Sequence, residues 1–192
     1  CVLDIASNDG TLLKNYSKNI FTFGIDPLVN KYKKEYTNIN YKVSDFFSQK
    51  KIKKITKRKF KIITALSVFY DSEDPNQFLS DVKDLLDSEG LFILEFADLA
   101  SIIKKKIFDK ICHEHLEYYS SKIIIDMCKK NNLKVIDILK NNINGSSKQF
   151  YITRETSNFK INKKKIQSFL NEEKKMQIHS KKIVRFTFQQ SM

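Results

Sequence analysis

The sequence has no hydrophobic run close to the roughly 20 residues that a membrane-spanning helix needs. It also has no cationic stretch followed by an apolar segment and a small-residue cleavage site, which a secretory leader would require. Cysteine is scarce, and Cys1, Cys112 and Cys128 show neither a CxxC pair nor the spacing of a disulfide framework or a thiolate zinc site. We therefore expect a cytoplasmic protein with free thiols and no membrane partner.

Arginine is also in short supply. The net charge is +13, but only Arg58, Arg154 and Arg185 are arginines among the 35 basic residues. Recognition of phosphates and bases favours the planar fork of arginine. Lysine, asparagine and isoleucine are abundant together, which is what an A/T-rich coding bias would produce. We therefore expect a solvated lysine surface and no nucleic-acid partner.

Short apolar runs alternate with helix-compatible segments over the first half of the chain. Strands are expected at residues 2–5, 21–25, 41–43, 60–69 and 91–96. Helices are expected at residues 11–16, 28–36 and 75–86, with a solvated helix or loop at residues 49–59. This alternation is typical of a parallel, doubly wound α/β sheet with right-handed crossovers.

The second half of the chain adds strands that leave the parallel pattern. Ser120 can cap a helix that runs to about residue 131, and strands follow at residues 133–139 and 148–153. The pair Asn144 and Gly145 predicts a turn that joins these two strands as antiparallel edge strands. The sequence thus predicts a mostly parallel, seven-stranded, Rossmann-like sheet with an antiparallel last strand.

The 192 residues are enough for one well-buried domain, which we expect to span residues 1–157. Residues 158–192 are rich in lysine and follow a helical pattern, which predicts a connector and the start of a truncated C-terminal domain. Cys1 opens directly on a strand-like run, and the chain stops within a helical pattern. We therefore expect a fragment of a longer protein, and a monomer.

Open α/β sheets bind ligands at the carboxyl ends of their strands, where the strand order reverses. The stretch "DIASNDG" after the first strand has Ala6 and Asn8 where the dinucleotide fingerprint has glycines, and it keeps only Gly10. It also lacks the Lys-Ser/Thr pair of a P-loop. A dinucleotide and a nucleoside triphosphate are therefore disfavoured. S-adenosylmethionine carries no phosphate, and it needs a narrow turn and polar acceptors instead.

Three acids at the ends of successive predicted strands could supply these acceptors. Asp4 would meet the ammonium group, Asp26 the ribose diol, and Asp45 the adenine amino group, with Phe46 near the adenine ring. Each acid also has a structural alternative, because Asp4 could orient the loop and Asp26 and Asp45 could cap helices. The predicted cofactor-binding residues are Asp4, Ala6, Ser7, Asn8, Gly10, Asp26, Pro27, Asp45, Phe46 and Leu66.

Four segments, "VLDIASNDGTLL", "GIDP", "FYDSEDPNQFL" and "FDKICHEHLEYYS", resemble the S-adenosylmethionine-dependent C-methyltransferases that act on nucleotide-linked deoxysugars. The resemblance covers residues 2 to about 153 and implies the class I methyltransferase fold. It also implies a zinc-binding domain upstream of Cys1, so zinc would be a cofactor only outside this chain. Two positions depart from the family. Ala6 replaces a glycine and should narrow the loop, and Cys112 replaces a tyrosine that is implicated in catalysis.

The triplet His113, Glu114 and His115 could bind a metal, close a loop or transfer a proton. A metal needs further ligands, the only other histidine, His179, lies far off in the sequence, and the spacing is not HExxH. A histidine can also simply bond to backbone groups. In an extended loop, His113 and His115 would share a face while Glu114 points elsewhere. Methylation of carbon needs an enolate, which an imidazole with a pKa near the working pH can generate.

The resemblance implies the same roles, with His115 as the base at C-3 of a 4-keto sugar and His113 and Glu114 orienting it or stabilising the enolate. The expected partner is a small molecule, a nucleotide sugar. An O- or N-methyltransferase would share the cofactor loop and need no enolate machinery. A nucleic-acid amino methyltransferase typically has Asn/Asp-Pro-Pro-aromatic after the fourth strand, where this chain has "ALSVFYDSEDP". A binding module that has lost the chemistry is the remaining alternative.

Overall fold

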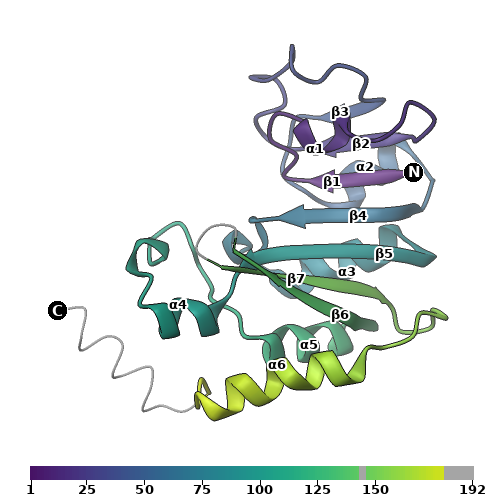
Figure 1. The fold of residues 1–192 in the computed structure, drawn as a ribbon. Coiled ribbons are helices and arrows are strands. Elements are labelled where there is room, and N and C mark those ends of the chain that lie inside the picture. The colour runs from purple at the N-terminus through teal and green to yellow at the C-terminus, as the bar shows by residue number, and fades with distance from the viewer. Residues whose placement is uncertain (143–145, 180–192) are drawn as a thin grey trace.

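The computed structural model describes residues 1–142 and 146–179. Within these residues, seven strands form one sheet in the order β3-β2-β1-β4-β5-β7-β6 (Figure 1). The strands are β1 (Val2–Ile5), β2 (Thr22–Ile25), β3 (Tyr41–Val43), β4 (Phe60–Leu66), β5 (Leu86–Ala97), β6 (Leu133–Asn141) and β7 (Ser147–Arg154). The first five strands pair in parallel, so their carboxyl ends lie at one edge of the sheet.

The position of β7 corrects one part of the prediction. β7 lies between β5 and β6 and is antiparallel to both, so it is an interior strand, and of β6 and β7 only β6 is an edge strand. The local pattern predicts two antiparallel strands but not which of them contacts the rest of the sheet. The predicted turn at Asn144 and Gly145 lies outside the described residues. The mostly parallel, seven-stranded sheet with an antiparallel last strand is confirmed.

The sheet is covered on both faces, as a parallel sheet requires. The larger hydrophobic cluster includes the fully buried Leu3, Ile63, Phe92 and Phe150, and it takes in side chains from α2, α3, α5 and α6. A smaller cluster is formed by Val2, Leu13, Val29, Tyr36 and Ile39, with Leu13 supplied by α1. The second cluster positions the loop that follows β1, which belongs to the candidate site described below.

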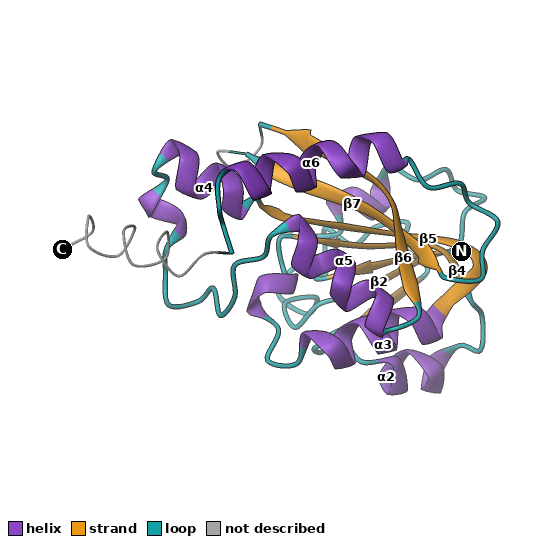
Figure 2. Ribbon diagram, turned by 90° about the horizontal axis from the view of Figure 1, so that it is seen from below, coloured by secondary structure: helices purple, strands orange, loops and turns teal. Residues whose placement is uncertain are grey.

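The helices are α1 (Thr11–Lys14), α2 (Gln49–Ile55), α3 (Pro75–Leu85), α4 (Leu99–Lys105), α5 (Ser121–Lys130) and α6 (Lys163–Lys175), with short 3-10 turns η1 (Phe69–Asp71) and η2 (Phe108–Lys110). α2, α3 and α5 lie side by side along one side of the sheet (Figure 2). The Ser120 hydroxyl accepts the Ile123 N–H, so the predicted cap of α5 is confirmed. None of the helices in the described residues combines the length and the apolar character that a membrane crossing needs.

Two segments differ from the prediction. Residues 28–36 form a series of turns rather than a regular helix. The smaller hydrophobic cluster includes the side chains of Val29, Tyr32 and Tyr36, which have the spacing of one helical face. The residues between them are exposed, so they add no packing that would favour a continuous helix. α4 was not predicted, although Asp98 caps it by accepting the Ala100 and Ser101 N–H groups.

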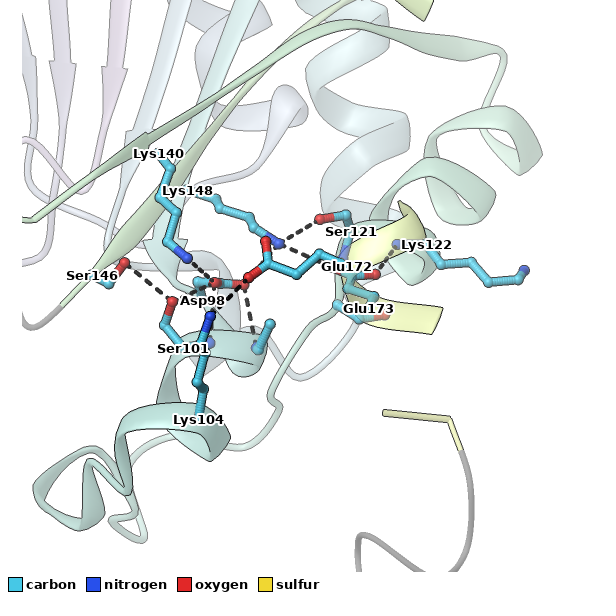
Figure 3. Close-up of polar contacts among 12 residues, drawn as sticks. Asp98, Ser101, Lys104, Ser121, Lys122, Lys140, Ser146, Lys148, Glu172 and Glu173 are labelled. Carbon is cyan, nitrogen blue, oxygen red and sulfur yellow. Dashed lines mark hydrogen bonds and ion pairs between the residues drawn. The ribbon is translucent and has the colours of Figure 1, made fainter. Parts of the chain in front are cut away.

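A buried group of charges fixes α6 to the rest of the domain (Figure 3). The Lys148 ammonium lies 2.9 Å from Asp98 and 3.0 Å from Glu173, and it also donates to the Ser121 hydroxyl at 2.8 Å. Lys148, Asp98 and Glu173 are each 1% exposed. Glu173 belongs to α6, which follows the predicted domain boundary at residue 157. That boundary stays a prediction, but the part of α6 near Glu173 packs as one unit with β7 and α4.

Candidate active site

A cleft of about 740 Å³ opens at the carboxyl ends of β1, β2 and β4. Ile5 and Ile25 end their strands in it, and Val68 follows β4. Five of the predicted cofactor residues line the cleft: Ala6, Asp26, Pro27, Asp45 and Phe46. The structure therefore brings these five together from the ends of three successive strands.

The loop after β1 is a sharp turn with left-handed backbone conformations. Ala6 has φ +56° and Asn8 has φ +47°, and Gly10 follows with φ +74°. A side chain at Gly10 would approach Ile39 Cδ1 to 2.6 Å and displace that side chain, and the positive φ itself favours glycine there. The Tyr36 hydroxyl donates to the Asn8 carbonyl at 2.7 Å and lies 2.7 Å from the Ser7 hydroxyl. Tyr36, from a segment distant in the sequence, therefore stabilises the turn through these two hydrogen bonds.

Asp4 lies behind this loop and not in the cleft lining. It is 4% exposed, and the Thr64 hydroxyl donates to one of its oxygens. Burial raises the pKa of Asp4 to about 7; the Thr64 hydrogen bond opposes the rise and the nearby Asp26 adds to it. Ser7 is buried beside Tyr36, and Leu66, at the end of β4, is half-buried outside the lining.

Asp26 has a structural role at the edge of the cleft. Its carboxylate accepts the Asn8 N–H at 3.1 Å and the Leu28 N–H at 2.6 Å, so it holds two loops while it lines the cleft. Asp45 does not cap α2, because Ser48 precedes that helix. Asp45 instead pairs with Lys51 at 2.6 Å, and the Lys51 hydrogen bond lowers the pKa of Asp45. Phe46 lines the cleft and is 74% exposed.

The histidine triplet lies on a turn rather than in an extended loop. The His115 N–H donates to the Cys112 carbonyl at 3.3 Å, so His113 and His115 do not alternate on one face as predicted. His113 and Glu114 are exposed, and His115 is half-buried. His115 Nδ1 lies 3.0 Å from the Lys110 carbonyl. Because a carbonyl can only accept, Nδ1 carries the proton in the neutral ring and Nε2 is the basic nitrogen.

The turn packs on the segment after β4. The rings of His115 and Tyr70 have centroids 4.1 Å apart, and the Glu117 N–H donates to the Tyr70 carbonyl at 3.2 Å. Asp71, the next residue, lines the cleft. Burial raises the pKa of Asp71, the charge of His115 opposes the rise and Glu114 adds to it, so both residues lie within electrostatic reach of Asp71. The triplet thus adjoins the cleft through Tyr70 and Asp71.

Several site residues were not singled out from the sequence. Tyr70, Asp71 and Tyr118 surround His115, and Tyr36 supports the first loop. Two sequence signals were available for Tyr70 and Asp71: their position directly after a buried strand, and their place in the segment "FYDSEDPNQFL" that carries the family resemblance. In the described residues, no group of three His, Cys, Asp or Glu side chains is placed to hold a metal ion.

Comparison with known proteins agrees with this geometry. The profile of the family described as "Methyltransferase domain" matches residues 1–138. The chain belongs to this methyltransferase family. The C-methyltransferase NovU of Streptomyces niveus is 29% identical over 87 residues, which are 45% of this methyltransferase chain and 21% of NovU. The chain therefore matches about a fifth of the length of this relative.

Solved methyltransferases share the fold. A S-adenosylmethionine-dependent methyltransferase from Clostridium acetobutylicum superposes with a TM-score of 0.62 at 13% identity, covering 80% of this chain and 83% of its own. A putative methyltransferase of Haloferax volcanii, solved with the activator Trm112, has a TM-score of 0.61 at 12% identity, covering 80% and 82%. Magnesium protoporphyrin IX methyltransferase of Synechocystis, with bound SAH, has a TM-score of 0.56 at 16% identity, covering 80% and 73%. The prediction of a Rossmann-like methyltransferase domain is confirmed.

Proposed function

We propose that this domain uses S-adenosylmethionine to methylate a carbon atom of a nucleotide-linked keto-deoxysugar in the cytoplasm. The observation that carries the proposal is a half-buried imidazole, His115, with Nδ1 held by a carbonyl and Nε2 left basic, next to the cleft that the methyltransferase fold provides. The likeness to NovU, which is named a C-methyltransferase, supports carbon as the acceptor atom.

The residues of the cleft fit the proposed methyl donor. The cleft has the size of a small-molecule site and combines apolar walls with carboxylates at the strand ends. Asp26 at the end of β2 would accept from the ribose hydroxyls, and Asp45 and Phe46 after β3 would contact the adenine. When bound, S-adenosylmethionine supplies an electrophilic methyl group.

The chain's own part in the reaction is proton transfer. His115 Nε2 would take the proton from the carbon beside the ketone, and His113 and Glu114 would assist from the exposed side of the turn. The Lys110 carbonyl would stabilise the imidazolium that forms, because it accepts from Nδ1. The resulting enolate carbon is the nucleophile. Such general-base catalysis contributes about 10²- to 10⁴-fold to the rate.

The test is substitution of His115→Asn followed by measurement of solvent deuterium exchange into a thymidine diphosphate-linked 4-keto-6-deoxyhexose. We expect exchange and methyl transfer to fall by about 10²-fold or more, with S-adenosylmethionine binding unchanged by calorimetry. His179→Asn is the matched control, because His179 lines a separate pocket between α5 and α6. Exchange at the wild-type rate in His115→Asn would remove the histidine from this role. A methyl group found on oxygen or nitrogen would contradict carbon methylation.

A further inference from the structure

An enolate mechanism needs a hydrogen-bond donor for the oxygen that becomes negative when the base takes its proton. Three phenols lie near the histidine turn. The Tyr118 hydroxyl already donates to the Lys110 carbonyl at 3.0 Å and accepts the Cys112 N–H at 3.3 Å, so its proton is in use. Tyr119 is buried in the core, with its ring 5.1 Å from Phe69 and 5.7 Å from Phe96. Tyr70 remains as the candidate donor.

Tyr70 is held against the base at both its ring and its backbone. Its ring centroid lies 4.1 Å from that of His115 at an interplanar angle of 48°. Its carbonyl accepts the Glu117 N–H from the segment after the turn. His115 and Glu117, from the same loop, thus contact the ring and the backbone of Tyr70 and hold this residue beside the base, as a preorganised donor requires.

The hydroxyl end of Tyr70 has its own support. Ser67, the first residue after β4, has φ +56°, a conformation that costs a non-glycine residue about 1–2 kcal/mol. The Ser67 N–H donates to the Glu95 carbonyl at 2.8 Å, which holds this conformation. Burial raises the pKa of Tyr70; a hydrogen bond donated by the Ser67 side chain opposes this rise, and Asp71 and Cys112 add to it. The phenol is therefore protonated near neutral pH and able to donate.

We propose that Tyr70 is a catalytic residue that donates a hydrogen bond to the ketone oxygen of the acceptor while His115 removes the neighbouring proton. The inference rests on the proposed function. The proton of the C–H bond moves to His115 Nε2, and the electron pair of that bond delocalises onto the ketone oxygen, which the phenol stabilises while keeping its own proton. The pair then forms the new carbon–carbon bond as the methyl–sulfur bond breaks, and the neutral thioether leaves.

Tyr70→Phe keeps the ring contact with His115 and removes only the donor. We expect solvent exchange and kcat for methyl transfer to fall by about 10²- to 10³-fold, with KM and S-adenosylmethionine affinity changed less than threefold. Tyr151→Phe is the matched control, because it removes a half-buried phenol that bonds to Gln149 on β7. Ser67→Gly is the second variant. It removes the hydroxyl and relieves the positive φ, so it should lower kcat by a smaller factor without loss of melting temperature.

The outcomes separate the two proposals. A wild-type protein that binds S-adenosylmethionine but neither exchanges nor methylates carbon contradicts the proposed function itself. The role of Tyr70 alone is overturned if the wild type exchanges the substrate hydrogen with solvent and the Tyr70→Phe and Ser67→Gly variants exchange it equally fast. Loss of S-adenosylmethionine binding in Tyr70→Phe would show a structural role and would also overturn the proposal.

Discussion

Asp4 is a carboxylic acid in an environment that disfavours its charge. It lies at 4% exposure between β2 and β4, and burial raises its pKa to about 7 from an ordinary value of 3.8. A rise of this size lowers the free energy of unfolding by about 4 kcal/mol at high pH. Below the unfolded pKa, both states are protonated and there is no penalty. As the pH rises to about 7, the unfolded state ionises first, so the folded state loses relative stability.

Asp4→Asn should therefore stabilise the domain in a pH-dependent way. We expect the free energies of unfolding of the variant and the wild type to agree near pH 4 and to diverge up to pH 7, with the variant more stable by at most about 4 kcal/mol. Urea unfolding at four or five pH values measures the difference. Asp9→Asn, at an exposed position in the same loop, is the control. A constant difference across this pH range would show that Asp4 is ionised in the folded protein.

The position of Asp4 was only partly predictable from the sequence. The strand ends predicted a group of acids at one edge of the sheet, and Asp26 and Asp45 do line the cleft with Ala6, Pro27 and Phe46. Asp4 was expected among them, but it lies behind the loop, because its partner is the Thr64 hydroxyl across the sheet. The turn at His113–His115 was not predictable either, since three polar residues in a row have no periodicity from which to read a conformation.

At the scale of elements, α6 depends on a buried lysine. Lys148 of β7 lies between Asp98 before α4 and Glu173 of α6, and Lys140 approaches Asp98 at 3.4 Å from β6. Burial opposes ionisation of Asp98 and Glu173, but the Lys148 charge and the hydrogen bonds around each carboxylate outweigh it and lower both pKa values. Both acids thus contribute stability above their unfolded pKa values, and that contribution is lost as the pH falls through the folded values.

Lys148→Met should destabilise the domain by about 3–5 kcal/mol, because Glu173 loses its buried cation and Asp98 keeps the more distant Lys140 at 3.4 Å. Equilibrium denaturation measures this change. The triple variant with Asp98→Asn, Lys148→Met and Glu173→Gln removes the charges together and should recover most of the loss. Lys122→Met is the control, since Lys122 pairs with Asp126 on the surface and should change stability by less than 1 kcal/mol. A loss below 1 kcal/mol in Lys148→Met would refute the buried ion group as a source of stability.

The order of the elements along the chain was easier to predict than their neighbours in space. β1 and β3 have the predicted bounds, because short buried runs between turn residues define them. β5 begins earlier than predicted, at Leu86, and runs through polar residues before Gly90. A side chain at Gly90 would come 2.8 Å from the Phe60 carbonyl, a contact that only the paired strand reveals. β7 was assigned to the edge for the same reason, since strand order is set by pairing and not by local pattern.

Over the whole molecule, the charge of the cleft is opposite to that of the chain. The chain carries +13, yet six carboxylates and, in the described part of the chain, no lysine or arginine line the cleft. These acids are Asp26, Asp45, Asp71, Glu73, Asp74 and Asp81. The cleft thus favours a cation such as a sulfonium over an anion such as a diphosphate. In the proposed function, the nucleotide of the acceptor would lie outside it.

S-adenosylmethionine should accordingly bind more tightly than its product, in which the sulfur is a neutral thioether, at low ionic strength, by about tenfold. The preference should shrink as salt is added, because the exposed acids are screened. Calorimetric titration of both ligands at several salt concentrations measures the ratio. Glu73→Gln should reduce the preference, and Glu155→Gln, exposed beyond β7, should not. Equal affinities at all salt concentrations would contradict an electrostatic role for the cleft.

The interior place of β7 has a consequence for biosynthesis. While the chain is still being made on the ribosome, β5 and β6 are complete before any residue of β7 has been added. The outer edge of β5 and the inner edge of β6 then lack their native hydrogen-bond partners, and unpaired strand edges are where nascent chains associate wrongly. The eight residues of β7 that close the sheet also bring Lys148 to Asp98, whereas Glu173 follows later in the chain, in α6. The buried charge group is therefore completed after the sheet, when α6 brings Glu173 to Lys148 in the newly made chain.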